Sequence, residues 1–322
     1  MKHTKYFQDF LSEEVNLNPT RLQRLDSSSS AVDTFLSGNL DLYEKTERQG
    51  SYGLKTIIKP VGPLEYDADL LLYMAYDEDK KPKDYINDVY DCLKGNDNYK
   101  DKVHRRTRCV YIDYAGDFHL DIVPCITQYN WLTQEEEYFI CNNKENKFEL
   151  TDGTGYRDWF NEKTRITNGN LKRDTRLLKF LRDHKGNFSV KSILLTTLIG
   201  NSVYSWDERG EDFKDIPTSL KTISNRINNF LQANISMPEI CNPVLSTESF
   251  TRHWDQDKYC HFRKMFDLYN SKINEAFDAT DHNTSVKKWR EVFGDNFGEL
   301  KKDNSNKNAA PITVKAPKFY AR

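Results

Sequence analysis

Two aspartates interrupt an otherwise apolar run over residues 66–73, and this pattern limits the possible fold more than any other feature. In an extended strand, residues two positions apart share a face, so Asp67 and Asp69 lie on one side. Ala68, Leu70 and Leu72 then face the other side. Neighbouring carboxylates repel each other unless a cation lies between them. The run therefore predicts a sheet strand with one face in a hydrophobic core and the other at a metal site.

A second predicted strand supplies a third carboxylate. Residues 118–123 follow a turn at 115–117, and a neighbouring strand in the same sheet would bring Asp121 beside the aspartate pair. Carboxylate oxygens are the ligands that Mg²⁺ prefers. Two such ions, ~3.5–4 Å apart, activate a hydroxyl nucleophile and stabilise a leaving pyrophosphate. We interpret Asp67, Asp69 and Asp121 as the metal ligands and catalytic residues of a nucleotidyltransferase.

A Gly-Ser pair precedes the aspartate strand. Gly50 lets the backbone approach a phosphate closely, and the Ser51 hydroxyl with neighbouring N–H groups can hold the β- and γ-phosphate oxygens. Alone, such a dipeptide is mostly an ordinary turn. Its position ahead of the three aspartates favours a phosphate-binding role.

With these residues the sequence resembles the bacterial cGAS/DncV-like nucleotidyltransferases (CD-NTases) of CBASS anti-phage signalling, which are related to cGAS and oligoadenylate synthetases. The matching stretches span nearly the whole chain: Gln49-Gly50-Ser51 with Thr56, 66–70, 118–124, 176–183 with Lys191-Ser192, and 289–295. The resemblance implies an α+β fold. A polymerase-β-like nucleotidyltransferase sheet domain with an N-terminal spine helix would face a C-terminal helical bundle domain across a cleft.

The resemblance also extends the candidate site. It places Gln49 with Gly50 and Ser51 among the nucleotide-binding residues, and it implies that Lys179 and Ser192 hold the triphosphate from the second half. By pattern alone, a lysine on an amphipathic helix is usually a solvated surface residue. Many relatives have a tyrosine after the serine to stack on the base, whereas Ile193 stands here. The base preference therefore stays open.

The implied activity is Mg²⁺-dependent synthesis of a cyclic di- or trinucleotide second messenger, with two ions and Mn²⁺ as a substitute. The substrates would be nucleoside triphosphates, with ATP favoured and GTP or a pyrimidine nucleotide as alternatives. A product-activated effector and a regulatory or conjugating partner encoded nearby would complete the pathway. Three alternatives share the aspartates: a linear oligonucleotide-forming enzyme, a protein-modifying nucleotidyltransferase, and an RNA-activated oligoadenylate-synthetase-like sensor.

Composition limits the partners. The 47 Lys and Arg residues nearly balance 49 Asp and Glu residues, so an obligate nucleic-acid partner is not expected. The six cysteines show no zinc-binding spacing and indicate reduced thiols. No signal peptide and no membrane-length apolar run is found in the sequence, which predicts a cytoplasmic protein that does not contact a membrane.

Helical periodicity predicts a short first helix with Phe7 and Phe10 on one face and a long spine helix that begins at Asn18-Pro19. A helix over 83–94 separates the first two aspartates from the third, and the second half is helical, including 220–231 and 265–277. We predict a nucleotidyltransferase core over 1–160, a helical substrate-binding domain over 161–300 and a mobile tail over 301–322. The Ala321-Arg322 end departs from the small terminal residue of conjugated relatives.

Two further features are ambiguous in the sequence. His119 shares a strand face with Asp121, and we favour a hydrogen-bonded structural histidine over one that tunes the metal site. The basic run 104–108 is typical of a charged edge strand, although it could also contact a triphosphate or a nucleic acid.

Overall fold

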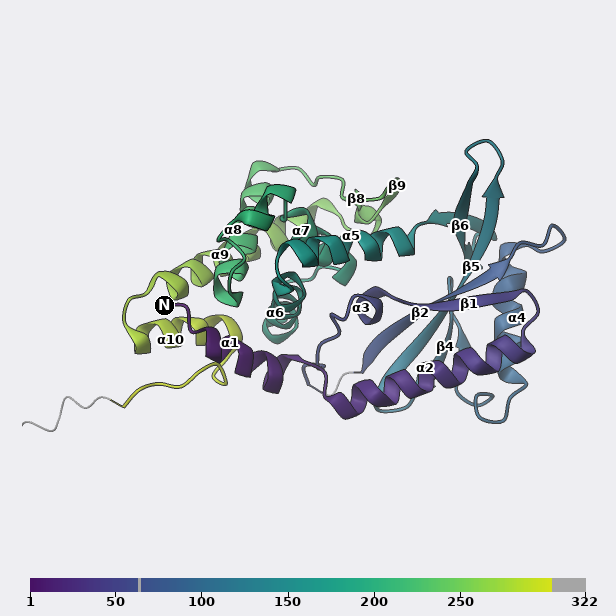
Figure 1. Ribbon diagram of the computed structural model, residues 1–322, viewed down its shortest axis with the longest axis horizontal. Coiled ribbons are helices and arrows are strands. Elements are labelled where there is room, and N and C mark those ends of the chain that lie inside the picture. Colours follow the sequence, from purple (N-terminus) through teal and green to yellow (C-terminus); the bar gives the residue numbers. More distant parts are fainter. Residues whose placement is uncertain (63–64, 303–322) are drawn as a thin grey trace, which may run out of the picture.

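The computed structural model describes residues 1–62 and 65–302, and it has two lobes (Figure 1). The sheet lobe contains α2 (Pro19–Asn39), β1 (Tyr43–Gln49), α3 (Gly50–Gly53), β2 (Tyr66–Ala75), α4 (Pro82–Lys94), β3 (Val103–Arg105), β4 (Val110–Tyr114), β5 (Phe118–Asn130), β6 (Glu135–Asn142) and β7 (Lys147–Thr151). The helical lobe contains α1 (Thr4–Phe10), η1 (Leu11–Val15), α5 (Gly153–Ile166), α6 (Asn170–Lys185), α7 (Ser192–Asn201), η2 (Ser205–Arg209), α8 (Ile216–Ala233), β8 (Cys241–Asn242), β9 (Leu245–Ser249), η3 (Thr251–His253), α9 (Gln256–Asp278) and α10 (His282–Phe293). The α+β fold class predicted from the sequence is confirmed.

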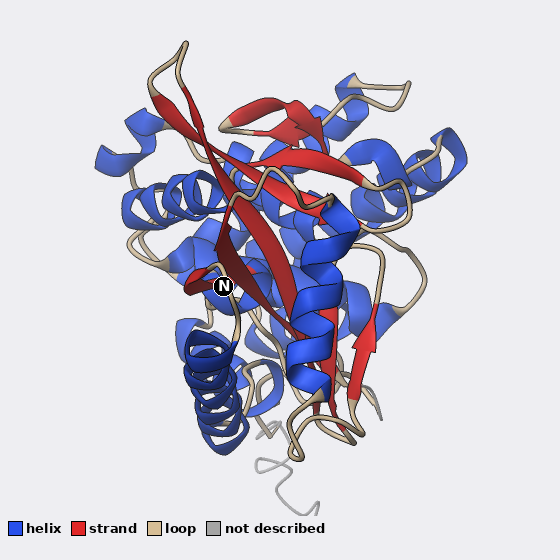
Figure 2. Cartoon of the chain, turned by 90° about the vertical axis from the view of Figure 1, so that its right-hand side faces the viewer, coloured by secondary structure: helices blue, strands red, loops and turns tan. Residues whose placement is uncertain are grey.

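The central sheet has the strand order β1-β2-β5-β4-β3, and β6 and β7 extend it from β5. Strands β2 and β5 are parallel, while their other neighbours in the sheet are antiparallel. Helices α2 and α4 lie against this sheet (Figure 2). Their apolar side chains share one buried core with Ala68, Leu70 and Leu72 of β2. The alternating side chains of residues 66–73 therefore lie on opposite faces of β2, as predicted. The aspartates occupy the face opposite this core.

The helical lobe has its own core, and the first helix belongs to it. The Phe7 ring of α1 lies 4.9 Å from the Trp289 ring of α10, and Phe10 packs against Phe180 of α6 at 5.2 Å. The chain enters the sheet lobe only with α2. The domain limits 1–160 and 161–300 stay a prediction, since an N-terminal helix of the first segment packs in the second lobe.

Several predicted elements have different ends in the structure. Helix α9 begins at Gln256, well before the predicted residue 265, because Asp255 accepts a 2.8 Å hydrogen bond from the Lys258 N–H and caps the helix. The expected Gly-Ser turn is the one-turn helix α3.

All six cysteines are free thiols. Most of the predicted mobile tail, residues 303–322, lies outside the described residues.

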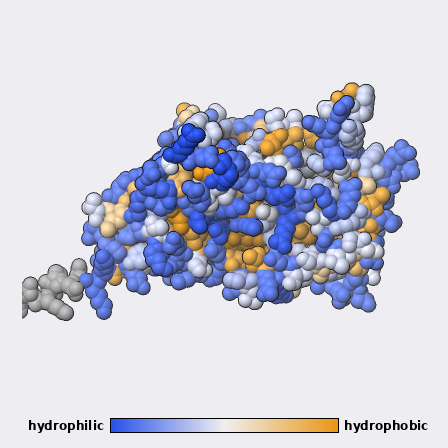
Figure 3. Space-filling model, viewed as in Figure 1, coloured by the Kyte–Doolittle hydropathy of each residue, from blue (hydrophilic) through white to orange (hydrophobic). Residues whose placement is uncertain are grey.

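Where the two lobes meet, apolar residues gather on a surface that is otherwise mostly hydrophilic (Figure 3). Within residues 1–62 and 65–302, no helix has both the length and the apolar character needed to cross a membrane.

Candidate active site

The parallel pairing of β2 with β5 brings the three predicted aspartates to one region. Its register places Asp69 directly opposite Asp121, and Asp67 opposite His119. Burial, together with the negative charges of Asp121 and Asp67, raises the pKa of the Asp69 carboxyl to about 7. Burial also raises the pKa of Asp121, although the Arg106 charge opposes this shift. Carboxylates that resist ionisation because of one another fit a site for divalent cations.

Gly50 is fitted closely against this carboxylate. Strand β1 pairs Gln49 with Asp69, and the backbone then turns at Gly50 with φ +56°. A Cβ atom on Gly50 would lie 2.3 Å from Oδ2 of Asp69, which is inside van der Waals contact. Both the left-handed backbone and the close approach therefore require glycine at this position.

Gly50→Ala is expected to lower nucleotidyl transfer by about 100-fold, because a displacement of order 1 Å at reacting groups has this effect. Its left-handed φ adds a stability loss of roughly 1 kcal/mol. Gly186→Ala is the matched control, since Gly186 has φ +59° and a Cβ atom added there would meet nothing within 4 Å. Urea unfolding and pyrophosphate release should show similar destabilisation in both variants and loss of activity in Gly50→Ala alone. Equal activities would contradict the argument.

A cavity of about 390 Å³ lies over the aspartates and takes its walls from both lobes. Seven of the eight predicted site residues line it: Gly50, Ser51, Asp67, Asp69, Asp121, Lys179 and Ser192. Gln49 instead lines an adjoining cavity of about 340 Å³, where its side-chain amide lies against Gly153 at the start of α5.

Lys179 is a buried cation in the cavity wall, and not a solvated surface residue. Its side chain is nearly inaccessible to solvent, and its Nζ donates to the Thr56 carbonyl oxygen at 3.2 Å. It also donates to the Thr56 hydroxyl at 3.3 Å. Burial lowers the pKa of Lys179 to about 8, so the ammonium lacks a full counter-charge. An anion that entered the cavity would supply it.

Arg182 is a cavity residue that was missed as a functional candidate. Its guanidinium donates to the Ser192 hydroxyl at 3.0 Å and to the Val190 carbonyl oxygen at 3.0 Å, which links α6 to the start of α7. The signal was present in the sequence, because Arg182 lies three residues after Lys179 and so shares its helix face.

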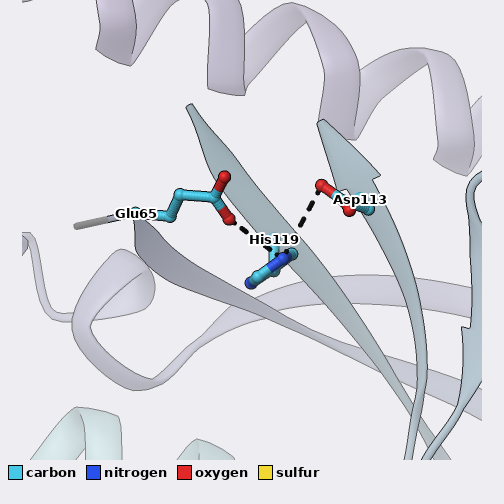
Figure 4. Close-up of side chains that lie close together, drawn as sticks. All are labelled: Glu65, Asp113 and His119. Atoms are coloured by element: carbon cyan, nitrogen blue, oxygen red, sulfur yellow. Dashed lines mark ion pairs between the residues drawn. The ribbon is translucent and has the colours of Figure 1, made fainter. Parts of the chain in front are cut away.

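Two of the three aspartates have other charged or histidine partners in this structure. The Arg106 guanidinium lies 3.1 Å from Oδ2 of Asp121, and Oδ1 of Asp67 lies 3.6 Å from Nδ1 of His119. In the described part of the chain, the group of three potential metal ligands whose atoms all lie within 4.8 Å of one another is Glu65, Asp113 and His119 (Figure 4). His119 Nε2 pairs with Glu65 at 3.0 Å, as a hydrogen-bonded structural histidine would.

The basic run 104–108 divides into two roles. Strand β3 is the edge strand that the charges predicted, and Arg108 pairs with Glu149 at 2.6 Å, away from the aspartates. Arg106 instead reaches the site, with its guanidinium 4.1 Å from the centre of the Tyr111 ring and paired with Asp121.

The profile of one protein family, described as the Second Messenger Oligonucleotide or Dinucleotide Synthetase domain, matches residues 1–164. The chain belongs to this family. It is therefore a nucleotidyltransferase of the CD-NTase type, which makes oligonucleotide or dinucleotide second messengers. The matched residues include β1, α3, β2 and β5, and so every sheet-lobe residue of the candidate site.

Individual relatives agree with this assignment. A c-di-GMP synthase of Roseivirga ehrenbergii is 27% identical over 300 residues, which cover 83% of this chain and 77% of that protein. The fold is similar to CdnC of E. coli MS115-1 solved with ATP, with a TM-score of 0.72 at 17% identity over 92% of this chain and 99% of that chain. It is also similar to the DncV cyclic AMP-GMP synthase of Vibrio cholerae solved with the linear intermediate pppA(3',5')pG, with a TM-score of 0.72 at 14% identity over 92% and 97%.

Proposed function

We propose that this chain joins nucleoside triphosphates into a cyclic di- or trinucleotide in an Mg²⁺-dependent reaction. The observation that carries the proposal is the pairing of Asp69 with Asp121 on adjacent parallel strands, under a cavity whose far wall contains Lys179. Carboxylates on one side and cations on the other match a triphosphate with its metal ions.

Each residue has a proposed task. Lys179, Arg182 and Ser51 bind the triphosphate, while Asp67 and Asp69 would hold two divalent cations with Asp121 as a further ligand. The cations, when bound, neutralise the triphosphate and increase the acidity of the attacking hydroxyl. Asp121 orients that hydroxyl toward the α-phosphorus. For this, Arg106 must give up its pairing with Asp121, while its guanidinium can keep the contact that it already makes with the Tyr111 ring.

The relatives suggest the course of the reaction and its setting. DncV was solved with a linear intermediate, and we propose that here too a linear product rebinds and closes. CdnC was solved in a complex with a HORMA protein, which supports a regulatory partner for this chain. We further propose a cytoplasmic role in anti-phage defence, with a product-activated effector.

The test is to incubate the purified chain with all four ribonucleoside triphosphates and Mg²⁺, digest with phosphatase, and identify resistant products by mass spectrometry. We expect a cyclic product that disappears with EDTA, returns with Mg²⁺ or Mn²⁺, and is absent from Asp67→Asn and Asp121→Asn. Linear, phosphatase-sensitive chains or labelled protein would contradict the cyclic product. Synthesis that survives both variants would contradict the assigned carboxylates.

A further inference from the structure

The cavity of about 340 Å³ adjoins the catalytic cavity on the other side of Asp69. The two cavities share Gly50, Leu54, Asp69 and Ile193 as lining residues. Both have the size of small-molecule sites, roughly 300–1,000 Å³. A nucleotidyl transfer holds a donor and an acceptor nucleotide at the same time, with the reacting atoms in contact. Two cavities that meet at a catalytic carboxylate suit such a pair of substrates.

Polar groups from the helical lobe reach into the second cavity. The small hairpin β8–β9 contacts strand β7 of the main sheet and supplies lining residues to this cavity. Glu248 of β9, Asn242 of β8 and Arg252 line the cavity. The Asn242 amide donates to Oε2 of Glu248 at 2.8 Å, which fixes the carboxylate at the cavity wall. Burial raises the pKa of Glu248, and the Arg252 charge opposes that shift.

The two cavities differ in the cations that line them. The catalytic cavity contains Lys179 and Arg182, which suit a triphosphate. In the lining of the second cavity Arg252 is the cation, beside Asp69, Asp152 and Glu248, so a polyphosphate would find less counter-charge there. A carboxylate at a half-buried wall instead suits a ligand that presents N–H donors.

Among the nucleobases, guanine presents the matching edge. Its N1–H and N2–H groups are adjacent donors that one carboxylate can accept together, and its O6 and N7 atoms are the acceptors that arginine prefers. Adenine offers an acceptor, N1, beside its N6 donor and would leave a buried carboxylate oxygen unpaired. We propose that the second cavity binds the acceptor nucleotide and that Glu248, with Arg252, selects guanine there. This inference rests on the proposed nucleotidyl transfer.

Nucleoside monophosphates isolate the acceptor position, because they lack the pyrophosphate leaving group and cannot be donors. The experiment supplies GMP, IMP or AMP as acceptor with each α-labelled triphosphate in turn and measures the linear product. We expect the unaltered protein to use GMP about tenfold or more better than AMP and better than IMP, which lacks only the N2 amino group. Glu248→Gln should reverse the preference toward AMP, because a carboxamide supplies one acceptor and one donor. The exposed Glu13→Gln, outside both cavities, should keep the original preference.

The outcomes separate the two proposals. Equal use of the three monophosphates, or an unchanged preference in an active Glu248→Gln protein, overturns the selection of guanine and leaves the proposed function intact. If Glu248→Gln does not fold, the comparison of GMP with IMP on the unaltered protein decides. If no donor gives any transfer, the proposed function fails, and equilibrium dialysis with labelled GMP and AMP then tests the cavity directly. Equal binding of both would overturn the inference.

Discussion

Asp69→Asn is expected to lower product formation by ~1,000-fold or more and, at the same time, to stabilise the metal-free protein. The loss of activity follows because a metal-binding carboxylate contributes several kcal/mol to the transition state. The gain in stability follows from the pKa of Asp69, which is raised to about 7 in the folded protein. Its ionised carboxylate is therefore disfavoured by folding, and the asparagine amide avoids this cost.

The raised pKa of Asp69 also determines how the stability of the protein changes with pH. Between the unfolded pKa near 4 and the folded pKa near 7, the folded protein binds the proton more tightly, so its stability falls as the pH rises through this window. Above this pH window, the free energy of unfolding of Asp69→Asn should be higher than that of the unaltered protein by on the order of 2–4 kcal/mol. Urea unfolding in EDTA at pH 5 and pH 8 measures the difference, which should be larger at pH 8.

Asp67→Asn is the control for this effect. The Asp67 side chain is 67% exposed, so its replacement should remove activity with little change in stability. An Asp69→Asn protein that is less stable than the unaltered protein at pH 8 would refute the electrostatic account of the site.

Lys179→Met is expected to raise the KM for nucleoside triphosphates by roughly 10- to 100-fold, because a charged hydrogen bond to a phosphate is lost. The same change should stabilise the free protein below pH 8, by up to about 3 kcal/mol, since folding buries a cation whose pKa falls from 10.5 to about 8. The folded protein binds this proton more weakly, so the stability of the unaltered protein should rise from pH 8 toward pH 10.5. The stability difference should vanish over that range.

Steady-state kinetics from pH 7 to 9.5 provide a second measurement. The KM of the unaltered protein should increase above pH 8 as Lys179 loses its proton. The KM of Lys179→Met should not show this increase, because methionine has no proton to lose. Lys185→Met, on the same helix α6 but outside the cavity lining, is the control and should keep the original KM. A normal KM in Lys179→Met would exclude a role in triphosphate binding.

Local patterns in the sequence predicted the centre of the site well. The period-two alternation of residues 66–73 assigned both faces of β2, because burial of one face leaves few alternatives for a strand. The strand at Asp121 was predicted from local composition, and the parallel register completed the arrangement. Helical periodicity likewise predicted the helices α2 and α4, whereas the α+β fold was implied by the resemblance to the CD-NTases.

Contacts between distant segments were not predictable in this way. The periodicity of α1 indicates that Phe7 is buried but does not say that its neighbours belong to α10. Arg106 lies in a basic run whose members have different partners, and only the pairing of β4 with β5 brings it near Asp121. Gln49 is the last residue of strand β1, and its neighbour Gly153 comes from the start of α5.

The packing of α1 in the helical lobe has a mechanical consequence. The chain passes between the lobes near Asn16, where a β-bridge to Ile58 holds it, and again between β7 and α5. Two covalent crossings at separate points define an axis for relative rotation of the lobes, whereas a single linker would allow rotation in any direction. The lobes can bend about this axis to admit and release nucleotides, but a relative twist would strain both crossings. We therefore expect cleft opening to follow this axis, which would keep Lys179 facing the aspartates as the lobes move.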